Sequence, residues 1–141
     1  EKGNIGFKLA SMPGIGPLLS KFTPKWLIKK SLEDVYSDKT KISAPLIDRY
    51  YELLLREGNR RATLDIFRQR RNPDPEKIRS IKIHTLILWG EKDQLIDVSN
   101  AVLFHRDIQN STLVVLPNSG HVPMEESPDE VEEAIRTFLR N

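Results

Sequence analysis

The sequence predicts an α/β fold of parallel strands and helices over residues 79–141, preceded by a helical region over residues 1–78. Residues 79–141 hold two short apolar runs that alternate with helical patterns, whereas residues 1–78 show helical spacing and no obvious strand. Residues 72–75 (NPDP) read as a linker. Residues 1–79 contain 17 Lys or Arg against 10 Asp or Glu, while residues 80–141 contain 5 against 10. We therefore expect two regions with different surfaces.

The first region reads as short helices with clear start and stop signals. Thr23-Pro24 is typical of an N-cap followed by a first-turn proline and begins a helix that continues through Leu32. Ser43-Ala44-Pro45 begins a second helix in the same way, with apolar residues at spacings of one, three and four. Gly58 ends that helix, and Asn59 provides the cap of a third.

The second region alternates between strands and helices. Residues 85–89 (TLILW) and 112–116 (TLVVL) are continuous apolar runs, as expected of strands buried on both faces. Residues 97–109 form a helical pattern with Asp97 as the N-cap, and residues 127–130 (SPDE) are a capping box that begins a terminal helix. Two parallel strands leave sheet edges uncovered, so we expect the rest of the sheet N-terminal to Glu1 or on another chain.

An acid and a histidine follow the two predicted strands. Asp93 and His121 lie beyond the carboxyl ends of the strands, where the reacting groups of open α/β sheets collect. An imidazole can accept a proton from a nucleophile and return it, and an acid beside it fixes its tautomer and stabilises its charged form. Gly90 and Gly120 allow the backbone to turn sharply before each loop. We take Asp93 and His121 as candidate catalytic residues.

Each of these residues also has a structural interpretation. Asp93 alone is typical of a turn after a strand, and His121 alone of a capping or core histidine. Nearby carboxylates that could replace Asp93 are Glu91, Asp97, Glu125 and Glu126. His84 and His105 are expected to be structural. We expect no metal and no cofactor, because cysteine is absent and the histidines lack metal-binding spacing.

The arginines of residues 60–71 could face acidic lipid, nucleic acid or an anionic substrate, or form a solvated helix face. No aromatic interleaving or nucleic-acid motif accompanies these arginines, so we expect no nucleic-acid partner. The sequence has no apolar run of about 18 residues and no signal-peptide pattern. We expect a cytoplasmic protein, although a chain that begins with Glu1 leaves open a signal or anchor upstream.

Residues 86–93 (LILWGEKD) and 120–128 (GHVPMEESP) resemble the acid and histidine segments of the α/β-hydrolase superfamily, and the 28-residue separation of Asp93 and His121 fits. The resemblance implies that Asp93 is the triad acid after the seventh strand and His121 the base after the eighth. It implies that residues 79–141 are a C-terminal segment of the core. Residues 1–78 would be a helical cap or lid with the return to the core.

The resemblance also implies a serine-type hydrolase that acts on a carboxylic ester, with an apolar ester or acyl substrate. The 141 residues contain no Gly-x-Ser-x-Gly nucleophile elbow and no oxyanion-hole segment. We therefore expect this chain to be inactive by itself, with the N-terminal half of the same protein as its partner. If the chain folds alone, we expect a homo-oligomer that covers the strand at residues 86–89.

Three alternatives remain within this superfamily. An epoxide hydrolase or dehalogenase resembles the same fold with an aspartate nucleophile. Hydrolysis of a carbon–carbon bond, or perhydrolysis, would use the same triad as an esterase. A non-catalytic hydrolase-fold binding protein would need neither Asp93 nor His121.

Overall fold

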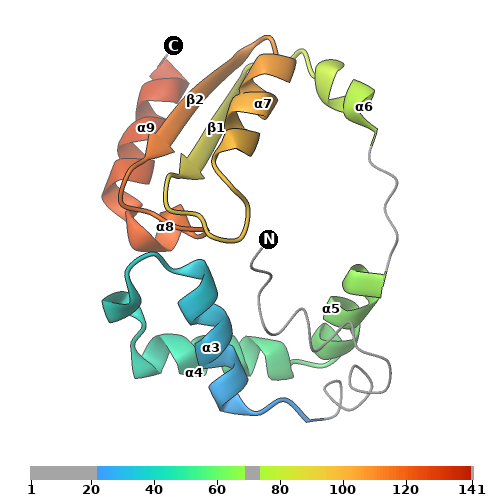
Figure 1. Cartoon of the computed structure of the whole chain (residues 1–141), viewed down its shortest axis with the longest axis vertical. Coiled ribbons are helices and arrows are strands. Elements are labelled where there is room, and N and C mark those ends of the chain that lie inside the picture. The colour runs from blue at the N-terminus through green and yellow to red at the C-terminus, as the bar shows by residue number, and fades with distance from the viewer. Residues whose placement is uncertain (1–21, 69–73, 141) are drawn as a thin grey trace. The chain divides into compact units, whose positions relative to one another are not determined.

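The computed structural model describes residues 22–68 and 74–140 (Figure 1). The described chain forms two units, the first made of residues 22–34 and 39–68 and the second of residues 35–38 and 74–140. A short piece of the region expected to form a cap, Val35–Asp38, therefore belongs to the α/β unit. The assignment of residues 1–78 as a cap remains a prediction, and part of the predicted linker lies outside the described residues.

The first unit is helical, with α3 (Lys25–Val35), the 3₁₀ turn η1 (Lys39–Lys41), α4 (Ala44–Leu55) and α5 (Asn59–Arg68). Leu27 and Leu32 of α3 are buried. Ser43 caps α4 as the sequence predicts, because its hydroxyl accepts a hydrogen bond from the Leu46 N–H at 3.3 Å. Between α4 and α5, Gly58 has a φ of 81°, a left-handed conformation that glycine adopts without strain.

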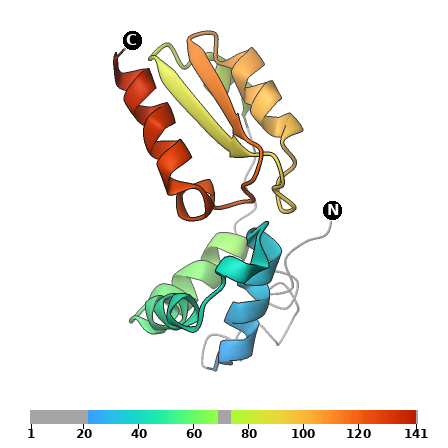
Figure 2. The ribbon, with the colours of Figure 1, turned by 90° about the vertical axis from the view of Figure 1, so that its left-hand side faces the viewer.

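The second unit contains α6 (Pro75–Arg79), β1 (Thr85–Gly90), α7 (Ser99–Asp107), β2 (Ser111–Leu116), α8 (Pro123–Glu126) and α9 (Pro128–Arg140). The two strands pair in parallel, from Thr85 opposite Ser111 to Gly90 opposite Leu116. The strands lie between α7 and α9, which cover opposite faces of the sheet (Figure 2). This order of elements confirms the predicted parallel α/β architecture.

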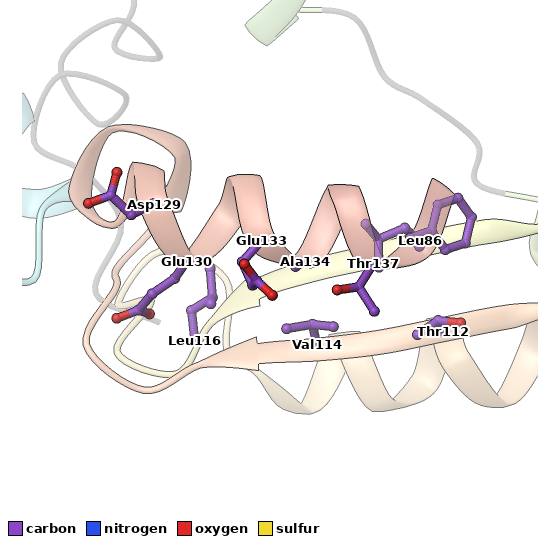
Figure 3. Close-up of a pocket in the computed structure, with 10 residues that line it drawn as sticks. Leu86, Thr112, Val114, Leu116, Asp129, Glu130, Glu133, Ala134 and Thr137 are labelled. Carbon is purple, nitrogen blue, oxygen red and sulfur yellow. The ribbon is translucent and has the colours of Figure 1, made fainter. Parts of the chain in front are cut away.

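The core of the second unit lies on the α7 face of the sheet. Ile87, Ala101 and Ile108 are buried together there, and further apolar side chains from α6, β1 and β2 pack around them. On the other face, an open groove of about 500 Å³ separates α9 from the strands, with Leu86 and Val114 on one side and Ala134 on the other (Figure 3). The open groove on the α9 face and the small, two-strand sheet limit the apolar surface that the second unit buries.

Two details differ from the sequence predictions. Val115 is 38% exposed, so the strands are not buried on both faces within this chain, because two strands leave open edges. Helix α7 begins at Ser99, and Asp97 instead accepts a hydrogen bond from the Ser99 N–H at 2.8 Å, in the turn before the helix. In the loop that contains His121, Pro123 begins the one-turn helix α8. Within the described residues, the helices are all too short or too polar to cross a membrane.

Candidate active site

Two loops meet at the carboxyl ends of β1 and β2. The acid loop (residues 91–98) follows β1 and contains Asp93, and the histidine loop (residues 117–122) follows β2 and contains His121. The Glu91 N–H donates to the Leu116 carbonyl at 2.9 Å, and the Lys92 N–H donates to the Ser119 carbonyl at 3.0 Å. A side chain at Gly90 would overlap the carbonyl groups of Ser119 and Gly120, so only glycine permits this close approach. The parallel register therefore brings the acid loop and the histidine loop together, as the sequence predicts.

Asp93 and His121 are hydrogen-bonded in this arrangement. Nδ1 of His121 lies 2.9 Å from Oδ2 of Asp93. The Asp93 side chain is 4% exposed, whereas that of His121 is 32% exposed. Because a carboxylate only accepts hydrogen bonds, the proton of the neutral imidazole lies on Nδ1, and Nε2 is left to accept a proton. An acid–imidazole pair of this kind can perform general acid–base chemistry.

Local backbone contacts orient the carboxylate of Asp93. Its Oδ1 accepts hydrogen bonds from the N–H groups of Leu95 at 2.8 Å and Ile96 at 2.9 Å. The indole N–H of Trp89 donates to the Ile96 carbonyl at 3.1 Å and so ties the far end of the acid loop to β1. One carboxylate oxygen is thereby held by the loop, which leaves the other facing the imidazole.

The other carboxylates considered from sequence have different partners. Asp97 accepts hydrogen bonds from the side chain and N–H of Ser99, which hold the pKa of this carboxyl below its ordinary value. Glu125 accepts a hydrogen bond from the hydroxyl of Tyr36. Glu126 accepts hydrogen bonds from the N–H groups of Gly120 and of residues 37 and 38. The side chain of Glu91 is exposed. The geometry thus pairs Asp93, rather than these four, with His121.

The remaining histidines lie away from this pair. The ring centroid of His84 lies 4.2 Å from that of Phe138, with the two rings tilted by 38°, and Nδ1 of His105 lies 2.9 Å from the Ser111 hydroxyl. Among the residues that the structure describes, no group of three or more potential ligands is arranged to bind a metal. The groove beside α9 is lined by neither Asp93 nor His121.

Sequence reasoning missed one buried polar contact of this site. Glu126 is 2% exposed and bonds the backbone of Gly120, directly before His121, and segment 35–38. Glutamate is rarely buried, and the partners in segment 35–38 are more than 80 residues away in the chain, so no local pattern indicates the contact. The only signal is its place within the segment that resembles the hydrolase histidine motif.

Comparison with known proteins agrees with this architecture. The profile of the alpha/beta hydrolase family matches residues 3–134, so the chain belongs to the alpha/beta hydrolase family. This confirms the fold class that the sequence predicts. The catalytic roles of Asp93 and His121 remain predictions, supported by their geometry.

Individual relatives cover different parts of the chain. It is 30% identical over 129 residues to the uncharacterized hydrolase YugF of Bacillus subtilis (strain 168), covering 88% of this chain and 47% of that protein. It is 41% identical over 64 residues to the monoacylglycerol lipase ABHD6 of Mus musculus, covering 45% of this chain and 19% of the lipase. This chain thus spans about half the length of YugF and less of the lipase.

Among solved structures, the chain resembles that of a serine hydrolase involved in carbazole degradation, the CarC enzyme. The TM-score is 0.76 at 26% sequence identity, and the match covers 83% of this chain and 47% of that enzyme. The similarity therefore extends over most of the chain and again over about half of the relative.

Proposed function

We propose that this chain supplies the acid and the base of a serine-type hydrolase that cleaves carboxylic esters. The observation that carries the proposal is the 2.9 Å contact between His121 and Asp93 at the carboxyl ends of two parallel strands. A buried acid beside a partly exposed imidazole is the arrangement that general base catalysis requires.

The proposed reaction proceeds in two halves. A serine Oγ from the N-terminal part of the same protein attacks the acyl carbon, and its proton passes to Nε2 of His121. Asp93 stabilises the imidazolium, which then protonates the departing alcohol as the ester carbon–oxygen bond breaks. His121 next takes a proton from water as the water attacks the acyl-enzyme, and the proton returns to serine as the acid is released.

The names of two relatives support this choice. The mouse relative is a monoacylglycerol lipase, which indicates an ester, and the CarC enzyme is described as a serine hydrolase. The apolar side chains of Phe22 and Trp26 are 67% and 60% exposed in the first unit, which suits an apolar ester or acyl substrate. We propose such a substrate, with an aspartate nucleophile of the epoxide hydrolase or dehalogenase type as the alternative.

The test is turnover of p-nitrophenyl butyrate by the full-length gene product. We expect His121→Ala to reduce kcat by at least about 10³-fold, because the serine would lose its general base. His105→Ala is the matched control, since this histidine is exposed and bonds Ser111 on the surface. A folded His121→Ala variant that retains more than a tenth of the wild-type kcat would refute the proposal.

A fluorophosphonate probe distinguishes the two nucleophiles. A serine activated by His121 would be phosphonylated, and the intact mass would increase by one probe moiety, with no increase in His121→Ala. An aspartate nucleophile would leave the mass unchanged and would instead form an ester with an epoxide or haloalkane substrate. That result would favour the alternative.

A further inference from the structure

Glu126 is a buried acidic residue close to, but outside, the pair of Asp93 and His121. It is the last residue of α8 and is 2% exposed. A carboxylate loses hydration when it is buried, so it is retained only where hydrogen bonds replace the water. The partners of Glu126 therefore indicate what the residue does.

The two oxygens of Glu126 bind two separate segments. Oε1 accepts a hydrogen bond from the Gly120 N–H at 2.7 Å. Oε2 accepts hydrogen bonds from the N–H of Ser37 at 2.8 Å, the hydroxyl of Ser37 at 2.6 Å and the N–H of Asp38 at 3.2 Å. One carboxylate thus connects the residue before His121 to residues 37 and 38, which lie 89 and 88 residues before Glu126 in the sequence.

The same two segments are joined by two further hydrogen bonds. The His121 N–H donates to the Val35 carbonyl at 2.8 Å, and the Ser37 hydroxyl lies 2.9 Å from the Asn118 carbonyl. A side chain at Gly120 would clash with the Val35 carbonyl, the Ser37 N–H and Glu126 itself. The backbone on the N-terminal side of His121 is therefore enclosed between Glu126 and segment 35–38.

We propose that Glu126 is a positioning residue that holds His121 in place against Asp93 through the Gly120 N–H, an inference that rests on the proposed function. The imidazole is 32% exposed, so packing around the ring leaves it partly unconstrained, and the backbone must fix its position. Charge-assisted hydrogen bonds are well suited to this task. A displacement of about 1 Å in a catalytic group costs on the order of 10²-fold in rate.

The chemistry of the site favours a carboxylate over an amide. Both oxygens of Glu126 face donors, and a carboxylate is acceptor-only on both sides. A glutamine of the same shape would direct its NH₂ group at either the Gly120 N–H or the donors of residues 37 and 38. Glu126→Gln therefore breaks one side of the bridge while it preserves side-chain volume.

The experiment measures Glu126→Gln in the full-length gene product with p-nitrophenyl butyrate. We expect kcat to fall by about 10- to 100-fold, with KM changed by less than about twofold, because the imidazole is displaced but ester binding is retained. Glu132→Gln is the matched control, since this exposed glutamate on α9 bonds Arg136 at 2.7 Å. The control should leave kcat and KM unchanged.

A second measurement is independent of turnover. Long-range ¹H–¹⁵N NMR reports which ring nitrogen of His121 carries the proton, with the resonance assigned by its loss in His121→Ala. In the wild type we expect the Nδ1–H tautomer, fixed by Asp93. In Glu126→Gln we expect a mixture that includes Nε2–H. If the wild type fails to hydrolyse the ester, the proposed function fails, while the tautomer still decides the role of Glu126.

A thermal unfolding scan separates positioning from support of the fold. A lower Tm with unchanged kcat and unchanged tautomer would overturn the proposal, and so would a variant identical to the wild type in all three. If Glu126→Gln does not fold, Ser37→Ala replaces it, because this change removes one donor to Oε2 and keeps the backbone bridge. We then expect a two- to fivefold lower kcat at constant KM, and an unchanged kcat would overturn the proposal.

Discussion

The two units of the chain differ in how they use buried residues. In the helical unit, α3 buries Leu27 and Leu32, while α4 buries no residue and Phe22, Trp26 and Ile66 remain more than half exposed. Among the described residues, the helical unit also buries the polar residue Thr23, whereas the α/β unit buries apolar side chains on the α7 face and the polar residues Ser119 and Glu126. These polar groups form hydrogen bonds around the histidine loop, since the Ser119 hydroxyl donates to the Ser127 hydroxyl and Glu126 accepts from the Gly120 N–H.

This difference shows that the α/β unit holds residues around the histidine loop in fixed positions through buried hydrogen bonds. Catalysis requires groups held within a fraction of an ångström, which buried hydrogen bonds provide. Under the proposed function, the exposed apolar side chains of the helical unit, such as those of Phe22 and Trp26, contact the substrate. Substitutions in the α/β unit should therefore affect activity and stability strongly, and comparable substitutions in the helical unit should affect them weakly.

The largest effect is expected at the acid. Asp93→Asn keeps the shape of the side chain but presents an amide that can favour the wrong tautomer of His121, so kcat should fall by about 10⁴-fold. Steady-state kinetics of the full-length gene product with p-nitrophenyl butyrate measures this effect. Asp97→Asn is the matched control, because Asp97 bonds Ser99 instead of the histidine. Equal losses in the two variants would contradict the assignment of the acid.

The next effect is on stability. Ile108 is 5% exposed in the α7-face core, so Ile108→Ala should lower the free energy of unfolding by about 2–5 kcal/mol. Trp26 is 60% exposed in the helical unit, so Trp26→Ala should change it by less than about 0.5 kcal/mol. Urea denaturation measures the free energy of unfolding of both variants. A larger loss for Trp26→Ala than for Ile108→Ala would reverse the comparison between the units.

Two glycines provide a sharper test. A Cβ at Gly90 would overlap carbonyl groups of the histidine loop, so Gly90→Ala should cost about 1–3 kcal/mol and also reduce kcat. Gly58 has open space around it but a φ of 81°, so Gly58→Ala should cost about 1 kcal/mol through backbone strain. Only the first variant should lose activity at a temperature where both are folded. A loss of kcat in Gly58→Ala would contradict this division.

Removal of the N-cap of α4 should lower the free energy of unfolding by a similar or smaller amount than Gly58→Ala. Ser43→Ala removes the side-chain acceptor of the Leu46 N–H and should cost about 1 kcal/mol, whereas Ser43→Asp should restore most of the stability. Thermal unfolding of the three proteins is the measurement. If Ser43→Ala has the stability of the wild type, the hydrogen bond does not stabilise the helix in solution.

The smallest effect concerns the ion pair between Arg106, whose side chain is exposed, and Asp107, whose side chain is 15% exposed. The hydrogen bond from Arg106 holds the pKa of Asp107 below its ordinary value. The folded protein therefore gains stability above the ordinary pKa of aspartate and loses it as the pH falls through the lowered pKa. Asp107→Asn should remove this small component of acid sensitivity, seen as a flatter dependence of Tm on pH. An unchanged pH profile would show that screening by solvent cancels the pair.

Local signals in the sequence determined much of the fold. Apolar runs fixed both strands, Ser43 with Pro45 fixed the start of α4, and the order of strands and helices fixed the parallel pairing. The same order placed Asp93 and His121 at one edge of the sheet, since the ends of neighbouring parallel strands meet there. These features depend on residues close together in sequence or on the general rules of parallel sheets.

Contacts between distant residues were decided only in the tertiary structure. Apart from its place within the segment that resembles the hydrolase histidine motif, nothing in the sequence near Glu126 indicates that it is buried, or that its partners include Ser37 and Asp38. Which of the neighbouring carboxylates pairs with His121 was also open until the hydrogen-bond geometry showed that it is Asp93. Periodicity and capping act over a few residues, whereas burial of a carboxylate depends on which donors the whole fold brings to it.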